Sequence, residues 1–229
     1  GPHFFGLDHA FGTDPRSRSG RGRVTMATPP TEVQRSERFA AYIEARRVDP
    51  PRPLLVKATA LAAGKEHALD AGAGALNATK YLLSAGFAHV TALDAAPSAQ
   101  KLAAELPPNQ VTFVLSRFED FAFPAGAYDL VNAEFSLPFI RAENFAAVFA
   151  RLIGSVRPGG LFTGQLFGPK DSWNVAGSGM NFHSRAAVET LLRGFELVEL
   201  EEEDHPGKTK LGDDKHWHIF HIIARKPAA

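Results

Sequence analysis

The sequence predicts an α/β protein with a doubly wound, mostly parallel sheet of seven strands that ends in an antiparallel hairpin. Short apolar runs typical of buried strands alternate with segments of helical periodicity through most of the chain. Strands separated by helices pair in parallel, with right-handed crossovers. The last two strand-like runs, 195–201 and 216–224, have no helix between them. Consecutive strands without a crossover helix pair antiparallel, which predicts the terminal hairpin.

The expected elements follow one another in a Rossmann-like order. A first helix over 32–46 ends before Asp49-Pro50-Pro51, because a residue that precedes proline disfavours the helical conformation. Gly86 is a typical C-terminal cap for the helix before it, and Pro107-Pro108 ends the next one. The other helices are expected at 54–63, 78–85, 98–106, 143–156 and 184–192. The parallel strands are expected at 67–70, 89–94, 111–115, 128–132 and 161–166, the last after the turn Pro158-Gly159-Gly160.

Composition limits the class of function. The 229 residues are enough for one sizeable core but few for two domains. Lys plus Arg equals Asp plus Glu at 25 each, so no net positive charge favours nucleic acid or an anionic membrane. The absence of cysteine excludes disulfides, thiolate metal sites and cysteine nucleophiles. No apolar stretch approaches the roughly 20 residues that span a bilayer, and we expect a cytoplasmic protein.

The beginning of the chain differs from the rest in composition. Gly1-Pro2 is typical of the remnant left when a protease removes an expression tag, and residues 13–25 are rich in Gly, Ser and Arg. We therefore expect a tag-derived or disordered tail over 1–25, a capping helix and linker over 26–52, and the α/β domain over 53–229.

A glycine-rich turn marks the expected ligand site. In open α/β sheets ligands bind at the carboxyl ends of the strands, where Asp70-Ala71-Gly72-Ala73-Gly74 follows the first strand. Glycines let the backbone approach a ligand, and the start of the next helix favours a carboxylate or phosphate. Asp94 ends the second strand, where a carboxylate can accept hydrogen bonds from ribose hydroxyls. Asn77 stands where a dinucleotide fingerprint has its third glycine, which weakens a pyrophosphate interpretation.

With these motifs the sequence resembles the class I methyltransferases that use S-adenosylmethionine. Asp70 to Gly74 matches their glycine-rich motif, and Asp94 matches their ribose-binding acid. Asp129-Leu130-Val131-Asn132 matches their fourth-strand motif, and Pro158-Gly159-Gly160 the turn before the fifth strand. The resemblance covers about residues 50 to 229, which makes 53–229 the methyltransferase domain, and the family's terminal hairpin agrees with the antiparallel ending.

Shorter segments resemble a subfamily related to bacterial tellurite-resistance proteins, whose members act on small molecules. These segments are Phe135-Ser136-Leu137-Pro138-Phe139, Gly164-Gln165-Leu166-Phe167-Gly168, Asp171-Ser172-Trp173 and Lys215-His216-Trp217-His218. The subfamily name does not identify tellurite as the substrate of this chain.

The resemblance implies which residues bind the cofactor. The backbone around Gly72 and Gly74 would face the methionine moiety, and Asp94 the ribose. Arg117 stands where many members have an acid for the adenine amino group, so adenine recognition would rest on backbone groups and Phe118. The full set of expected cofactor-binding residues is Asp70, Gly72, Ala73, Gly74, Asp94, Ala95, Arg117, Phe118, Asn132, Ala133, Glu134 and Phe135.

Candidate substrate-binding and catalytic residues gather in the second half of the chain. A sulfonium methyl is already electrophilic, so alignment and exclusion of water are enough and a catalytic side chain is not obligatory. The expected substrate-binding residues are Gln165, Asp171, Trp173 and Trp217, although the two tryptophans are as typical of a core. His216 and His183 are the candidate general bases. His216 and His218 share one strand face, but no third metal ligand is evident and we expect no metal.

The sequence leaves several functions open. We expect methyl transfer from S-adenosylmethionine, with S-adenosylhomocysteine as product, to an oxygen, nitrogen, sulfur or heavier chalcogen atom of a small-molecule acceptor. A non-catalytic S-adenosylmethionine-binding module and an NAD-linked oxidoreductase are the alternatives. Neither a membrane nor a nucleic acid is expected as partner, and no feature predicts an oligomeric state. Residues 199–204 form an acidic run that we expect to lead into a hairpin turn at Pro206-Gly207.

Overall fold

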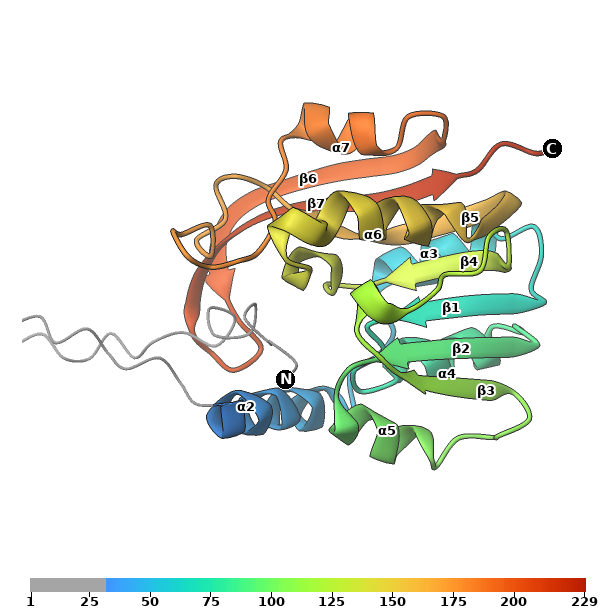
Figure 1. Cartoon of the computed structure of the whole chain (residues 1–229), viewed down its shortest axis with the longest axis horizontal. Coiled ribbons are helices and arrows are strands. Elements are labelled where there is room, and N and C mark those ends of the chain that lie inside the picture. The colour runs from blue at the N-terminus through green and yellow to red at the C-terminus, as the bar shows by residue number, and fades with distance from the viewer. Residues whose placement is uncertain (1–31) are drawn as a thin grey trace, which may run out of the picture.

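The computed structural model describes residues 32–229 and contains one seven-stranded sheet (Figure 1). The strand order is β3-β2-β1-β4-β5-β7-β6; β7 pairs antiparallel with both β5 and β6, and all other neighbouring pairs are parallel. The strands are β1 (His67–Ala71), β2 (His89–Asp94), β3 (Val111–Leu115), β4 (Tyr128–Ala133), β5 (Val156–Phe167), β6 (Glu196–Lys208) and β7 (Asp214–Arg225). The predicted parallel sheet with a terminal hairpin is confirmed.

The helices cover both faces of this sheet, as a doubly wound fold requires (Figure 1). The helices are α2 (Glu32–Arg46), α3 (Pro53–Leu61), α4 (Asn77–Ser84), α5 (Pro97–Ala103), α6 (Ala142–Gly154) and α7 (Arg185–Leu191). The short 3₁₀ turns η1 (Phe118–Asp120) and η2 (Leu137–Phe139) follow β3 and β4. The expected tail over 1–25, and the part of the expected linker before Glu32, lie outside the described residues.

The core forms two apolar layers because adjacent strand residues point to opposite faces. Leu69 of β1 and Val131 of β4 pack under α6 and α7 in one layer. Ala68 and Leu130, one position earlier on the same strands, pack under α3 and α4 in the other. Because both faces are covered, the central strands are apolar at consecutive positions, which is the pattern typical of a buried parallel sheet.

The terminal hairpin is longer than the sequence predicts. Pro206 and Gly207 lie within β6, paired with His216 and Lys215 of β7, so the turn expected at Pro206-Gly207 is wrong. The chain reverses between Lys208 and Asp214 instead. Strand β6 is the edge of the sheet, where a proline can be accommodated without loss of a ladder hydrogen bond on its outer side.

The tip of this hairpin curls toward α2 at the carboxyl ends of the parallel strands (Figure 1). Lys210 Nζ of the tip forms an ion pair with Asp49 Oδ1, just after α2, at 2.7 Å. Two segments far apart in sequence therefore meet over the end of the sheet where ligands bind in this fold class. Among residues 32–229 no helix is long and apolar enough to cross a membrane.

Candidate cofactor and acceptor site

A cavity of about 610 Å³ lies at the carboxyl ends of the parallel strands, beneath α2 and the hairpin tip. Its volume is in the range usual for small-molecule sites. The glycine-rich turn after β1 and the segments after β2, β3 and β4 form one end. Aromatic side chains from α2, η2, β5, β7 and the loop after β5 form the other. Twelve predicted site residues line it: Asp70, Gly72, Ala73, Gly74, Asp94, Ala95, Arg117, Phe118, Glu134, Phe135, Trp173 and Trp217.

The glycine-rich turn has a conformation that requires glycine at Gly72. The φ angle of Gly72 is +81°, and a Cβ there would lie 2.3 Å from Ser136 Cβ. Ser136 Oγ donates a hydrogen bond of 2.8 Å to the carbonyl of Ala71. The turn after β1 is therefore packed directly against the turn after β4, which closes the floor of the cavity.

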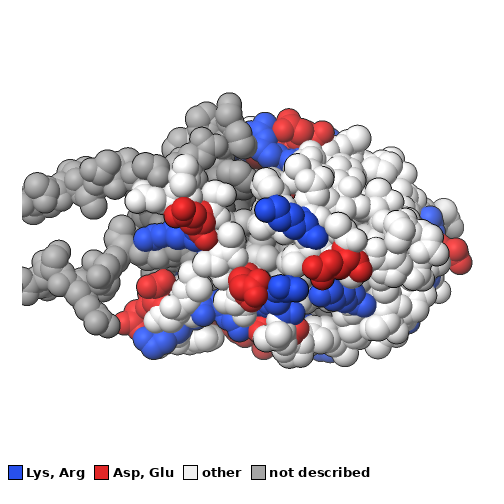
Figure 2. Space-filling model, turned by 90° about the horizontal axis from the view of Figure 1, so that it is seen from below, with Lys and Arg blue, Asp and Glu red and all other residues white. Residues whose placement is uncertain are grey.

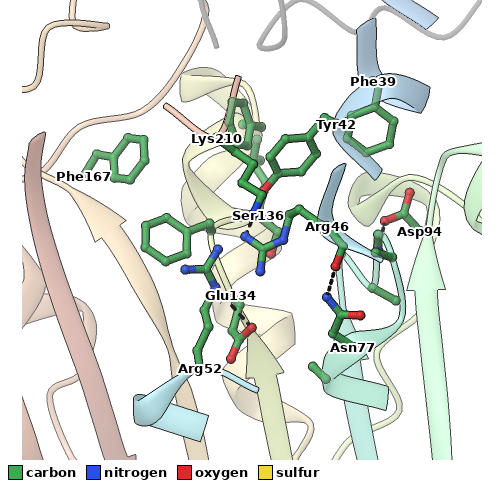
Figure 3. Close-up of a pocket in the computed structure, with 18 of the residues that line it drawn as sticks. Phe39, Tyr42, Arg46, Arg52, Asn77, Asp94, Glu134, Ser136, Phe167 and Lys210 are labelled. Atoms are coloured by element: carbon green, nitrogen blue, oxygen red, sulfur yellow. Dashed lines mark hydrogen bonds and ion pairs between the residues drawn. The ribbon is translucent and has the colours of Figure 1, made fainter. Parts of the chain in front are cut away.

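Asp94 both shapes this turn and faces the cavity. Its Oδ2 accepts a hydrogen bond from Gly74 N at 2.8 Å, and its Oδ1 accepts one from Ala96 N at 2.8 Å (Figure 3). Burial raises the pKa of Asp94, while the backbone donors oppose that shift. Each carboxylate oxygen keeps further lone-pair capacity for a ligand hydroxyl, so the geometry is compatible with the predicted ribose-binding role.

Asp70 is held in place from two sides. Its Oδ2 accepts a hydrogen bond of 2.6 Å from Thr79 Oγ1, and its Oδ1 accepts one of 3.1 Å from Asn132 Nδ2. Burial raises the pKa of Asp70 to about 6. Asn132 and Ala133 are fully buried and do not line the cavity, so Asn132 acts on the site through Asp70.

Glu134, immediately after β4, is a buried carboxyl group with an unsatisfied oxygen. Its Oε1 has no hydrogen-bond partner among the described residues, and its Oε2 lies 3.5 Å from Arg52 Nε. Burial, reinforced by the nearby charge of Asp70, raises the pKa of Glu134 to about 8, although Arg46 opposes the shift. Figure 3 shows Arg46, Arg52 and Glu134 converging on the cavity.

A side-chain hydrogen bond from Asn77, the residue at the third-glycine position of a dinucleotide fingerprint, attaches helix α2 to the start of α4. Asn77 Nδ2 donates a hydrogen bond of 2.6 Å to the carbonyl of Arg46, at the end of α2 (Figure 3). Phe39, Tyr42 and Arg46 of α2 line the cavity, and they were missed as site residues. They are spaced three and four residues apart and so lie on one face of the helix. This spacing in the sequence could have identified them as a group facing one site.

The predicted adenine-flanking residues lie at the edge of the cavity. Arg117 pairs with Asp120, its Nε donating to Oδ2 at 2.9 Å, so its guanidinium is directed to a local partner. Phe118 packs against Phe123, with ring centroids 6.3 Å apart. Its Cζ lies 3.6 Å from the position that a Cβ on Gly72 would occupy. Phe118 thus offers an apolar ring beside the glycine-rich turn.

Phe135 has an unusual backbone conformation that a buried glutamine supports. Its φ is +50°, in the left-handed region that is rare for a large side chain. Gln165 Oε1 accepts a hydrogen bond from Phe135 N at 3.0 Å. The Arg52 guanidinium lies over the Phe135 ring, 4.3 Å from its centroid. Gln165 is buried and does not line the cavity, so its contact with the site runs through Phe135.

Asp171 is also buried behind the cavity wall. Its carboxylate forms an ion pair with Lys215 Nζ, and both side chains are completely inaccessible to solvent. Its Oδ1 accepts a hydrogen bond from Trp173 N at 3.0 Å, and its Oδ2 accepts one from His218 N at 3.2 Å. Asp171 therefore fixes the loop that carries Trp173. Its charge partner is Lys215, which the sequence placed in a subfamily-like segment without predicting a role for it.

The structure places the two candidate general bases outside the cavity. His216 is paired with Asp204 on the neighbouring strand, its Nε2 2.7 Å from Oδ1. His183 Nε2 lies 2.7 Å from Asn181 Oδ1, and burial lowers the pKa of His183. His218 faces Glu202, with its Nε2 2.9 Å from Oε1. Within residues 32–229 no three His, Cys, Asp or Glu side chains are grouped closely enough to hold a metal ion.

Part of the chain matches a known protein family. Residues 68–160 match a protein family described as a methyltransferase domain. No curated protein sequence matches the chain significantly. The matched segment runs from β1 into β5 and contains the glycine-rich turn, Asp94 and the fourth-strand motif, whereas the segments at 164–168, 171–173 and 215–218 lie beyond it.

Solved structures with the same fold include several methyltransferases. The 1,6-didemethyltoxoflavin-N1-methyltransferase of Burkholderia thailandensis, bound to 1,6-didemethyltoxoflavin and S-adenosylhomocysteine, has 23% identity and a TM-score of 0.61 over 84% of this chain and 87% of that chain. TehB of Haemophilus influenzae has 16% identity and a TM-score of 0.65, over 77% of this chain and 62% of its own. The N-methyltransferase NodS of Bradyrhizobium japonicum, bound to S-adenosyl-L-homocysteine, has 13% identity and a TM-score of 0.60, over 82% of this chain and 98% of that chain. These likenesses confirm the fold.

The residues around the cavity fit S-adenosylmethionine. The cofactor carries a sulfonium, an ammonium and a carboxylate, and the cavity offers the carboxyl group of Glu134 beside the guanidinium groups of Arg46 and Arg52. The unpartnered Oε1 of Glu134 is a buried acceptor that a cationic ligand would satisfy. Asp94 would hold the ribose, and the Gly72 turn leaves room for close backbone approach.

Proposed function

We propose that this chain is an S-adenosylmethionine-dependent methyltransferase that methylates a small molecule; the family match over residues 68–160 and the fold support this proposal. The acceptor atom is an oxygen, nitrogen, sulfur or heavier chalcogen. The main support for the proposal is that the predicted cofactor residues and an aromatic wall line the same cavity. One end has the charged groups that suit the cofactor, and the other leaves an apolar space for an acceptor.

The covering of the cavity supports a small acceptor. Helix α2 and the hairpin tip lie above it, joined by the ion pair between Lys210 and Asp49. A folded protein or a duplex could not reach a group inside such a space without displacing both segments. On the face shown in Figure 2, Lys and Arg are interspersed with Asp and Glu, which offers no extended positive surface for a nucleic acid.

The protein's contribution to this reaction is positioning and exclusion of water. When bound, S-adenosylmethionine supplies an electrophilic methyl group on a sulfonium centre. Gly72 and Asp94 would fix the nucleoside and methionine parts, and Phe135 and Trp173 would align the acceptor. No side chain needs to form a covalent bond. Glu134 is the ionisable group on the cavity wall closest in sequence to Phe135, and its pKa of about 8 suits it to hold or release a proton near neutral pH.

The proposal is tested by product formation with a mixed acceptor panel. The purified protein is incubated with S-adenosylmethionine and phenols, heteroaromatic N–H compounds, thiols, selenols, a histone-type peptide and transfer RNA, and S-adenosylhomocysteine is measured. Formation with one small-molecule class, lost in Asp94→Ala, is the expected result. Formation only with the peptide or RNA would contradict a small-molecule acceptor. Cofactor binding without turnover of any acceptor would favour a non-catalytic binding module.

Glu134 predicts how stability depends on pH. Its pKa is raised from 4.5 to about 8 in the folded protein, so the folded state binds a proton more tightly than the unfolded state between these values. The resulting stabilisation is fully present below about 4.5 and is lost as the pH rises through about 8. Glu134→Gln removes this dependence. Melting temperatures of both proteins measured at pH 5, 7 and 9 should diverge, with the wild type losing more at high pH.

Asp70, with its pKa of about 6, changes stability in the same direction in both proteins, so the difference between their profiles reports Glu134 together with its coupling to Asp70.

Glu134→Gln also tests the electrostatic role of Glu134 in cofactor binding. Above pH 8 we expect Glu134→Gln to lower affinity for S-adenosylmethionine by about tenfold and for S-adenosylhomocysteine by less, because only the former carries a sulfonium charge. Parallel melting profiles would contradict the raised pKa of Glu134, and equal losses of affinity for the two nucleosides would show that Glu134 does not face the sulfonium.

A further inference from the structure

The acceptor end of the cavity is formed by a continuous aromatic wall. Trp173 and Trp217 pack edge to face with ring centroids 5.6 Å apart, and Phe139 lies 6.1 Å from Trp173. Phe167 lies 5.9 Å from both tryptophans. All four line the cavity, and the two indoles and Phe139 remain partly exposed to it.

The two tryptophans are fixed before any ligand arrives. The main-chain N of Trp173 donates to Asp171 Oδ1 at 3.0 Å, and its ring packs against Phe139, Phe167 and Trp217. The ring nitrogen Nε1 of Trp217 donates to the carbonyl of Lys208 at 3.3 Å. The buried Lys215 Nζ lies 3.8 Å from the ring centroid of Trp173 and 4.3 Å from that of Trp217. Rings held in this way lose little freedom on binding, which favours a rigid, flat partner.

The position of Lys215 also decides which charge the wall accepts. Indole faces attract cations, and the Lys215 ammonium already occupies that interaction with both rings from inside the protein. A second cation on the cavity side would meet rings whose electron density is already drawn to an ammonium. Burial lowers the pKa of Lys215 to about 8, and its pairing with Asp171 opposes the shift, so it stays largely charged at neutral pH.

From this geometry we propose that Trp173, Trp217 and Phe139 are the acceptor subsite, and that the acceptor is a planar aromatic or heteroaromatic compound that is neutral or anionic. This inference rests on the proposed methyltransferase function and adds the chemical class of its substrate. Lys215 is a positioning residue, because it touches the rings from behind and does not line the cavity. An offset or edge-to-face stack on these indoles distinguishes a flat ring from an aliphatic one of similar size.

The test uses three probes on protein saturated with S-adenosylhomocysteine. These are 2-naphthol, its saturated counterpart decahydro-2-naphthol, and tetramethylammonium. The chain has only two tryptophans, Trp173 and Trp217, so a change in indole emission reports contact with the wall, and calorimetry gives the affinities. We expect 2-naphthol to bind at least about tenfold more tightly than decahydro-2-naphthol, and tetramethylammonium to show no binding.

Substitution of each tryptophan tests whether the preference for 2-naphthol depends on the aromatic wall. Trp173→Leu and Trp217→Leu should each reduce the preference for 2-naphthol about tenfold while leaving S-adenosylhomocysteine affinity unchanged, which also shows that each variant is folded. Phe121→Leu is the matched control, because Phe121 is a partly buried aromatic residue away from the cavity.

Equal affinities for the two naphthol compounds, no binding of 2-naphthol, or tighter binding of tetramethylammonium would each overturn the proposed acceptor class. If S-adenosylhomocysteine fails to bind while 2-naphthol still prefers the wall, the proposed function fails and the aromatic subsite stands.

Discussion

Gly72→Ala is expected to lower the affinity for S-adenosylhomocysteine by at least about tenfold, equivalent to about 1.4 kcal/mol. The new Cβ would lie 2.3 Å from Ser136 Cβ and 2.8 Å from Ser136 Oγ, so one of the two turns must move. Both turns line the cavity. The φ of +81° adds backbone strain for any residue other than glycine. Calorimetric titration of both proteins checks the prediction.

Gly86→Ala is the matched control for Gly72→Ala. Gly86 also has a positive φ of +98°, but the nearest atom to its Cβ position is Lys65 Cδ at 3.8 Å, and it lies outside the cavity. It should cost about 1–2 kcal/mol of stability and leave binding unchanged. Combining Gly72→Ala with Ser136→Gly should recover part of the affinity, because it removes the clash but not the strain. Unchanged affinity in Gly72→Ala would contradict the assignment of this turn to the cofactor.

Lys215→Met is expected to lower the free energy of unfolding by about 3–5 kcal/mol. Methionine has a similar length but leaves the Asp171 carboxylate buried without its charge partner, and both side chains are inaccessible to solvent. Urea denaturation monitored by circular dichroism measures the loss. Lys208→Met is the comparison, because Lys208 is 64% exposed in its pair with Asp214 and should change stability by less than about 1 kcal/mol.

A second substitution separates charge from packing at this pair. Asp171→Asn in the Lys215→Met background should restore part of the stability, because an amide is less costly to bury than an unpaired carboxylate. If Lys215→Met alone lowers the free energy of unfolding by less than about 1 kcal/mol, the ion pair between Lys215 and Asp171 does not stabilise the aromatic wall.

The order of strands and the cofactor end of the cavity could be predicted because both depend on local sequence. Glycines after the first strand and Asp94 at the end of the second have signatures that no distant residue modifies. The same holds for the alternation of apolar runs with helices, which predicted six helices and seven strands to within a few residues at most ends. The turn predicted at Pro158-Gly159-Gly160 is wrong, because β5 already begins at Val156 and these residues form an irregularity in its pairing with β4.

The acceptor end could not be predicted in the same way, because contacts between distant segments create it. Lys215 lies in an apolar environment only because the loop after β5 carries Asp171 and Trp173 to β7. The turn was misplaced at Pro206-Gly207 because local propensity does not show that β6 is an edge strand, where proline is tolerated. His216 was singled out for its residue type, whereas its position outside the cavity depends on the register of β6 and β7.

Calorimetric titration of the wild-type chain with S-adenosylmethionine, S-adenosylhomocysteine and NAD, repeated with Asp94→Ala, decides whether this cavity is the cofactor site. We expect micromolar binding of both sulfur nucleosides, at least about tenfold weaker in the variant, and no binding of NAD. Binding of NAD alone, or of none of the three, would contradict the claim that this cavity holds S-adenosylmethionine.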